Sequence, residues 1–180
     1  MGRKKLKESE RRLSISINLE NWLWEVVDTT EKNRSQFFYS LFIEDLKAKF
    51  LKEDLVLESN NISEHTSELY KILILNKKQR LHLVKRMPIR RGLYLSKSDI
   101  LFPDNKKTAK SISLDKWIWD LIPFIIPNRS IYFQTLLEKK IKNTLIHAGL
   151  IREGTVLTKL HGGQYCQIIQ NQYALSKEIG

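Results

Sequence analysis

Polar and apolar residues alternate between residues 12 and 18, and this spacing of two is typical of a short β-strand. Leu13, Ile15 and Ile17 form the apolar face of this predicted strand. The opposite face carries only hydrogen-bonding side chains, which are Arg12, Ser14, Ser16 and Asn18. The strand is therefore expected to bury one face and to leave a polar face open.

The spacing of apolar residues becomes helical after residue 18. One stripe consists of Leu19, Leu23, Val26 and Val27, flanked by two tryptophans, and predicts a helix that ends near Lys32. Asn33 suits a left-handed residue after a helix, and Ser35 suits the N-cap of a second helix. That second helix is expected to run to about Phe50. Its inward side chains are expected to be Phe38, Leu41, Phe42 and Leu46.

The same pattern occurs again 95 positions later, without a gap, in residues 107–141. Ten of the 35 aligned residues are identical: Ser16, Ile17, Leu19, Trp22, Trp24, Asn33, Arg34, Ser35, Phe38 and Leu41 recur as Ser111, Ile112, Leu114, Trp117, Trp119, Asn128, Arg129, Ser130, Phe133 and Leu136. All four tryptophans lie at matched positions. Such a repeat indicates a unit that needs a second copy to bury its apolar face.

The second copy departs from the first at two places. Lys110 stands where the first copy has Ile15, so the second strand is expected to start later or to twist away. Pro123 falls inside the first helix of this copy and predicts a kink or an early stop. The second copy also offers a poorer set of polar side chains, which makes exact two-fold symmetry of any target doubtful. In its second helix Phe133, Leu136, Leu137 and Ile141 are expected to face inward, and Gly149 to end the helix.

The rest of the chain gives weaker signals. Residues 63–75 fit a helix with Leu69, Ile72 and Leu73 inward, but residues 70–75 and 80–85 also fit a hairpin. Two short runs around Gly162 and Gly163, residues 155–160 and 164–169, predict a C-terminal β-hairpin.

The chain carries a formal net charge of +11 over 180 residues, and its basic residues are clustered. Clusters lie in residues 1–12, 77–91 and 106–110, and the first and third lead into the two copies. This clustering favours a polyanionic partner, most simply nucleic acid, over a merely solvated surface. Cys166 is the only cysteine, which suits a reducing compartment. No apolar run reaches membrane-spanning length, and because residues 1–12 are not followed by an apolar stretch, we do not expect them to act as a secretory signal.

A strand of about six residues followed by two helices resembles the ribbon-helix-helix family of DNA-binding proteins, the class of the Arc and Met repressors. Here both copies lie in one chain, similar to the tandem type found among archaeal virus regulators and plasmid-transfer accessory proteins. The resemblance implies an α+β, mainly α fold, in which the two motifs form a pseudo-dimer with a short antiparallel β-ribbon. The expected organisation is a flexible basic arm (1–11), motif 1 (12–50), a basic connecting segment (51–106), motif 2 (107–148) and the C-terminal hairpin and tail (149–180).

In this family the ribbon enters the major groove of DNA. The resemblance therefore implies base contacts from the outer ribbon residues, which are Arg12, Ser14, Ser16, Asn18, Lys107, Ser111 and Ser113. It implies phosphate contacts from the two Asn-Arg-Ser turns, where helix amides add positive charge: Asn33, Arg34, Ser35, Asn128, Arg129 and Ser130. Lys77, Lys78 and Arg80 are further phosphate candidates. Plain helix capping explains the serines equally well but does not require the recurring arginines. The tryptophans are expected in the core rather than on a base-stacking platform.

The candidate function is a sequence-specific, double-stranded DNA-binding transcription regulator, acting in the cytoplasm of a prokaryotic host near the nucleoid and encoded by the host, a virus or a plasmid. One alternative is an accessory protein of plasmid or viral DNA processing, and another is an antitoxin-like protein-interaction module. His65, His82, His147 and His161 lack metal-ligand spacing with Cys166, and no phosphate-binding loop or catalytic set is recognisable. We therefore expect no catalysis, metal, cofactor, small-molecule substrate or membrane partner. Two chains could combine on DNA.

Overall fold

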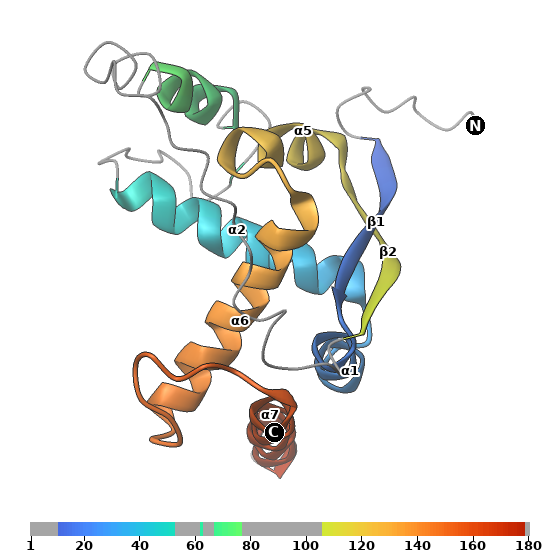
Figure 1. Ribbon diagram of the computed structural model, residues 1–180, viewed down its shortest axis with the longest axis vertical. Coiled ribbons are helices and arrows are strands. Elements are labelled where there is room, and N and C mark those ends of the chain that lie inside the picture. The colour runs from blue at the N-terminus through green and yellow to red at the C-terminus, as the bar shows by residue number, and fades with distance from the viewer. Residues whose placement is uncertain (1–10, 53–61, 63–66, 77–105, 179–180) are drawn as a thin grey trace.

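The computed structural model describes residues 11–52, 62, 67–76 and 106–178. The described chain is mainly helical, with one small two-stranded antiparallel sheet. Its elements are β1 (Arg12–Glu20), α1 (Asn21–Thr30), α2 (Arg34–Lys52), β2 (Lys107–Asp115), α5 (Lys116–Ile125), α6 (Arg129–His147) and α7 (Lys159–Glu178). Residues 67–76 form a further helix. Figure 1 shows the two strands along one side of the molecule and the helices on the other side of them.

β1 and β2 pair with each other over their whole length of nine residues each. β2 therefore does not start late, and the expectation from Lys110 was wrong. The reason lies in the lysine's partner, because Lys110 Nζ reaches Asp28 Oδ2 at 2.7 Å while its aliphatic stem stays on the inner side of the strand pair. Because its ammonium group pairs with a carboxylate near the surface, Lys110 fits into the strand without distorting it.

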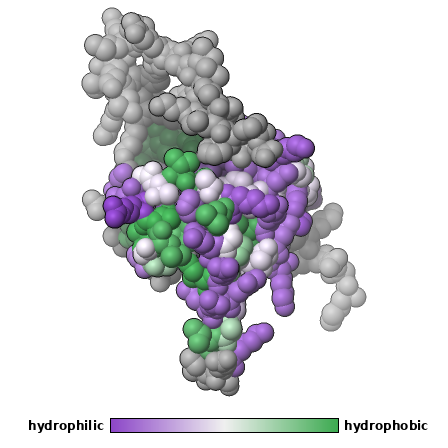
Figure 2. Space-filling model, turned by 60° about the horizontal axis from the view of Figure 1, so that its bottom comes forward, coloured by the Kyte–Doolittle hydropathy of each residue, from purple (hydrophilic) through white to green (hydrophobic). Residues whose placement is uncertain are grey.

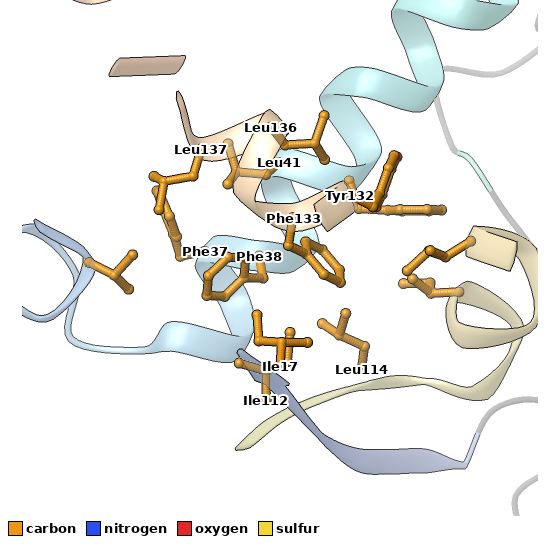
Figure 3. Close-up of a cluster of buried hydrophobic side chains, with 14 of the residues drawn as sticks. Ile17, Phe37, Phe38, Leu41, Ile112, Leu114, Tyr132, Phe133, Leu136 and Leu137 are labelled. Atoms are coloured by element: carbon orange, nitrogen blue, oxygen red, sulfur yellow. The ribbon is translucent and has the colours of Figure 1, made fainter. Parts of the chain in front are cut away.

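The core lies between the inner face of the two strands and the helices α2 and α6 (Figure 3). Ile17 and Ile112 point from the strands towards Phe38 and Phe133, whose ring centroids are 5.2 Å apart. All four of these side chains are essentially inaccessible to solvent. The inward residues expected for the two second helices are buried, as the helical spacing predicted. They are Phe38, Leu41, Phe42, Leu46, Phe133, Leu136, Leu137 and Ile141.

All four tryptophans are buried, so their predicted place in the core is confirmed. Trp22 and Trp24 lie two residues apart on α1 and so point to different sides of the helix, yet Trp22 is only 8% and Trp24 1% exposed. Helix α1 is covered on two sides, by α2 and by α7. Trp24 packs edge-on to Phe38 of α2, with ring centroids 5.7 Å apart, whereas Trp22 lies against α7.

The α7 helix replaces the β-hairpin that was predicted around Gly162 and Gly163, so that prediction was wrong. Both glycines lie within α7, and a Cβ on Gly162 would stand 2.9 Å from Trp22 Cε3 and from Val26 Cγ2. The glycine therefore serves the close approach of two helices rather than a turn. Burial of Tyr165 on the same helix, at 2% exposure, compensates for the weak helix propensity of two glycines.

The early stop expected at Pro123 does not occur, because α5 has the same ten-residue length as α1. Pro123 lies in the last turn and on the exposed side of α5, so only one backbone bond is lost there. The chain ends the helix just afterwards, where the amide of Ile126 still donates to the carbonyl of Ile122 at 2.9 Å.

Residues 67–76 are helical, which settles residues 70–75 in favour of the helix over the hairpin. The inward face was assigned wrongly, because Leu69 and Ile72 are 49% and 55% exposed. Tyr70 is buried instead and packs on Phe50 at 5.2 Å between ring centroids. A different prediction holds at the end of α6, where Gly149 adopts a φ of 71° and the helix stops.

Candidate nucleic-acid interface

The outer face of the strand pair, called the ribbon from here on, carries all seven residues that the sequence predicted as base contacts. The register brings them together, because directly opposite residues of an antiparallel pair point to the same side. From one end to the other, the outer pairs are Arg12–Asp115, Ser14–Ser113, Ser16–Ser111, Asn18–Ala109 and Glu20–Lys107. Ser14, Ser16, Asn18 and Ser111 are exposed, and no described helix covers them. Sequence reasoning did not include Ala109 in this set, although it completes the row.

The two strand–helix–helix units, residues 12–52 and 107–147, are related by an approximate two-fold axis. Ser16 faces Ser111, its own equivalent in the repeat, and their hydroxyl oxygens are 3.2 Å apart. The axis therefore passes through the centre of the ribbon. On the inner side it passes between Phe38 and Phe133, which are equivalent as well.

Tryptophan side chains hold each strand to the opposite unit. Trp24 Nε1 donates to the Thr108 carbonyl at 2.7 Å, and its equivalent, Trp119 Nε1, donates to the Leu13 carbonyl at 3.0 Å. These bonds give a carbonyl of each strand a side-chain donor from the opposite unit. The polar face of the ribbon is thereby fixed in position relative to the helices.

In the Asn-Arg-Ser turns, the asparagine and the serine have different roles from those predicted from the sequence. Asn33 and Asn128 are the N-caps, because their side-chain oxygens each accept from the amide three residues on, at 3.1 Å. Asn128 has a φ of −105°, so it is extended and not left-handed. Capping by Ser35 and Ser130 was thus a wrong prediction.

The two serines instead attach the helices to the edges of the ribbon. Ser35 Oγ accepts from the amide of Ser113, and Ser130 Oγ accepts from the amide of Asn18, both at 2.9 Å. The N-termini of α2 and α6 therefore lie beside the outer face, one at each edge. Free helix amides and the neighbouring arginines could meet phosphate groups that flank a groove occupied by the ribbon.

The arginines of the two turns are in different electrostatic states. Arg34 Nε lies 2.5 Å from Asp28 Oδ1, and the other oxygen of Asp28 binds Lys110. Burial acts to raise the pKa of Asp28, but the hydrogen bonds from Arg34 and Lys110 outweigh it and hold this pKa below its ordinary value. The ion pair raises the pKa of Arg34.

Arg129 has no such carboxylate, since Pro123 occupies the position equivalent to Asp28. Within the described residues no acidic side chain pairs with Arg129, and its Nε is buried without a hydrogen-bond partner. The guanidinium lies over the Trp119 ring, 5.8 Å from the centroid. This ring contact holds the guanidinium in place without neutralising its charge.

A polar hollow of about 540 Å³ opens between the first turn and the ribbon. It is lined by Asp28, Glu31, Lys32, Asn33, Arg34, Ser35 and Ser111. Two acidic side chains in this lining make it a poorer anion site than its helix N-terminus alone would suggest. Burial raises the pKa of Glu31, with Lys140 acting in the opposite direction.

The ends of the ribbon carry charged pairs. Arg12 Nε lies 3.5 Å from Asp115 Oδ1 at one end. At the other end Glu20 is buried, accepts from Trp22 Nε1 at 2.6 Å, and lies near Glu138. Burial is the main cause that raises the pKa of Glu138, and the charge of Glu20 adds to it.

Three of the predicted phosphate contacts, Lys77, Lys78 and Arg80, lie outside the described residues, as does most of the N-terminal basic arm. In the described part of the chain no helix is long and apolar enough to cross a bilayer. The same residues contain no group of three or more His, Cys, Asp or Glu side chains placed to hold a metal ion. No protein-family model, curated protein or solved structure matches this chain.

Proposed function

We propose that this chain is a sequence-specific, double-stranded DNA-binding transcription regulator with two ribbon-helix-helix motifs in one polypeptide. In this proposal the ribbon enters the major groove and the two turns contact the flanking phosphates. The observation that carries the proposal is the outer face of the ribbon. All seven polar residues expected to contact bases lie on that one face, while the opposite face is packed on α2 and α6.

The dimensions and chemistry of the ribbon support this function. The major groove of B-form DNA is about 12 Å wide and admits a two-stranded ribbon. Asn and Arg side chains can each make two hydrogen bonds to one base, and serine can bond to several. A net charge of +11 supplies the attraction to phosphate that any such complex needs.

The arrangement of the units also supports the assignment to tandem ribbon-helix-helix motifs. Each unit contributes one strand and two helices, the strands pair antiparallel about the Ser16–Ser111 centre, and both second helices cover the inner face. A duplicated helical hairpin used only for packing would not need a row of polar strand residues in which Ser14, Ser16, Asn18 and Ser111 are exposed.

Selection of bound duplexes from a random DNA library at near-physiological salt tests the proposal. The full chain is compared with a Ser14→Ala, Ser16→Ala and Asn18→Ala triple variant, whose changes lie on the exposed face and should leave the core intact. A matched control replaces Gln167, Gln170 and Asn171, exposed polar residues of α7, by alanine.

We expect a defined consensus for the wild type and for the control. The ribbon variant should lose the consensus but keep weak, salt-sensitive binding, because phosphate contacts do not depend on sequence. If the wild type yields no consensus, or if the ribbon variant keeps it, the proposed base recognition is wrong. Consensus-free binding would favour an accessory role in DNA processing, and absence of DNA binding would favour a protein-interaction module.

A further inference from the structure

The outer face of the ribbon breaks the two-fold symmetry that relates the units. Of the five outer positions in each strand, only Ser16 and Ser111 match. Because the strands are antiparallel, these differences make the two ends of the ribbon unlike each other. The Asn18 end carries Asn18, Ala109, Lys107 and the buried Glu20, and the Ser14 end carries Arg12, Ser14, Ser113 and Asp115.

The Asn18 end has the chemistry to distinguish bases. The amide of asparagine can pair with adenine at both N6 and N7, and a methyl group such as that of Ala109 can contact the methyl group of thymine. Asn18 and Ala109 face each other directly across the strands. An A·T pair at this end would therefore be recognised through both of its bases.

The Ser14 end has little power to discriminate. A hydroxyl group both donates and accepts, so Ser14 and Ser113 can bond to several bases. Arg12, the residue that could select guanine, lies 3.5 Å from the carboxylate of Asp115. A guanine contact would have to compete with that ion pair.

The two Asn-Arg-Ser turns also differ from each other, and each lies beside a different end of the ribbon. Ser130 binds the backbone of Asn18, so the turn whose Arg129 pairs with no carboxylate in the described part of the chain lies beside the Asn18 end. Ser35 binds the backbone of Ser113, so the turn in which Arg34 is paired with Asp28 lies beside the Ser14 end. Base recognition and available phosphate-binding charge are thus concentrated at one end.

We propose that the target is a non-palindromic duplex, bound in a single orientation. The Asn18 end takes a stringent half-site containing an A·T pair, and the Ser14 end takes a half-site of relaxed sequence. This inference rests on the proposed function and adds to it the polarity of the site. A protein built this way marks a direction along DNA, which a symmetric dimer cannot do.

The test is the same duplex selection, made with the full chain and with a variant whose ribbon is symmetric. The changes Arg12→Lys, Ser14→Ala and Ser113→Asn give both strands the order Lys, Ala, Ser, Asn on the outer face, so that both ends of the ribbon carry the residues of the Asn18 end. We expect the wild type to select a consensus in which one half is conserved and the other is degenerate. The symmetric variant should select a palindrome built from the conserved half.

Two single variants provide a second measurement that does not depend on the triple variant's folding. Asn18→Ala should make the conserved half degenerate, whereas Ser14→Ala should affect only the half that is already degenerate. A palindromic wild-type consensus, or equal effects of these two variants, would overturn the inference and leave the proposed function standing. Absence of any wild-type consensus would overturn the proposed function itself.

Discussion

The two strand–helix–helix units share a core but differ where they meet at its periphery. Asp28 of the first unit binds Lys110 of the second, and the symmetry-equivalent positions hold Pro123 and Ile15. A charged pair on one side of the axis thus corresponds to an apolar pair on the other. Pairing of the first unit with a copy of itself would place Asp28 against Ile15, and Asp28 would lose one of its two cations while keeping Arg34.

A second contact shows the same relation. The hydroxyl of Tyr132 donates to Asp45 Oδ2 at 2.6 Å, and burial together with Asp45 raises the pKa of that hydroxyl. The equivalent positions are Phe37 and Lys140, where Lys140 Nζ lies 5.8 Å from the ring centroid. Each unit is therefore complementary to the other rather than to itself, which joining them in one chain permits because the partner is always present.

The largest loss of stability should come from substitutions in the shared core, where the two units are alike. Phe38→Ala and Phe133→Ala each remove a fully buried ring at the axis, and each should lower the free energy of unfolding by about 3–5 kcal/mol. Chemical denaturation of both variants measures this. Clearly unequal losses would show that the two halves of the core are not equivalent.

The next effect should come from the packing of α7, which lies on α1 of the first unit and also contacts α6 of the second. Gly162→Val would push a side chain against Trp22 and Val26 and should cost about 1–3 kcal/mol of stability. Gly163→Val is the matched control, since nothing lies within 4 Å of a Cβ there. Thermal unfolding should place the control at or slightly above the wild type. Equal destabilisation by both substitutions would refute the close-packing role of Gly162.

The turns should differ in their contribution to DNA binding. Arg129→Ala should weaken binding about tenfold and reduce the salt dependence by about one phosphate contact, because no carboxylate among the described residues pairs with its charge. Arg34→Ala should have a smaller effect, since Asp28 already neutralises Arg34. Affinities at several salt concentrations measure both slopes. The reverse order would contradict the assignment of the stronger phosphate contact to the second turn.

The smallest effect on stability should come from the titration of Glu138, whose equivalent in the first unit is the apolar Ile43. Its pKa is raised in the folded state, so the folded protein binds this proton more tightly than the unfolded chain. Stability is therefore lost as pH rises from the unfolded pKa through the folded one. Glu138→Gln should be slightly more stable than the wild type at neutral pH and no more stable below the unfolded pKa. A stability difference that does not change between these pH values would rule out this titration.

Periodicity predicted the parts of the fold that depend on burying an apolar stripe. The strand, the helices of both units and their inward residues follow from Leu19, Phe38 and their repeated equivalents. The repeat also predicted the polar face of the ribbon, because alternation assigns each strand residue to one side. What lies outside the repeat, residues 149–178, was predicted wrongly, since two glycines suggest a turn unless their helical neighbour is known.

Contacts between units could not be predicted from spacing. Lys110 was interpreted as a defect because its partner, Asp28, lies in the other unit. Asn33 and Ser35 are both good caps, and only the position of the ribbon edge decides that the serine binds the strand instead. The local sequence shows which residues could cap a helix, and the tertiary contacts determine which residue does so.

The most direct measurement for the ribbon account is base-analogue interference on the selected duplex. Purines that lack N7, and uracil in place of thymine, remove groups displayed only in the major groove, whereas inosine in place of guanine alters the minor groove. We predict that the major-groove analogues at the Asn18 end weaken binding by the loss of about 1–3 kcal/mol per base contact, and that inosine has no effect. Binding that resists the major-groove analogues but fails with inosine would contradict insertion of the ribbon into the major groove.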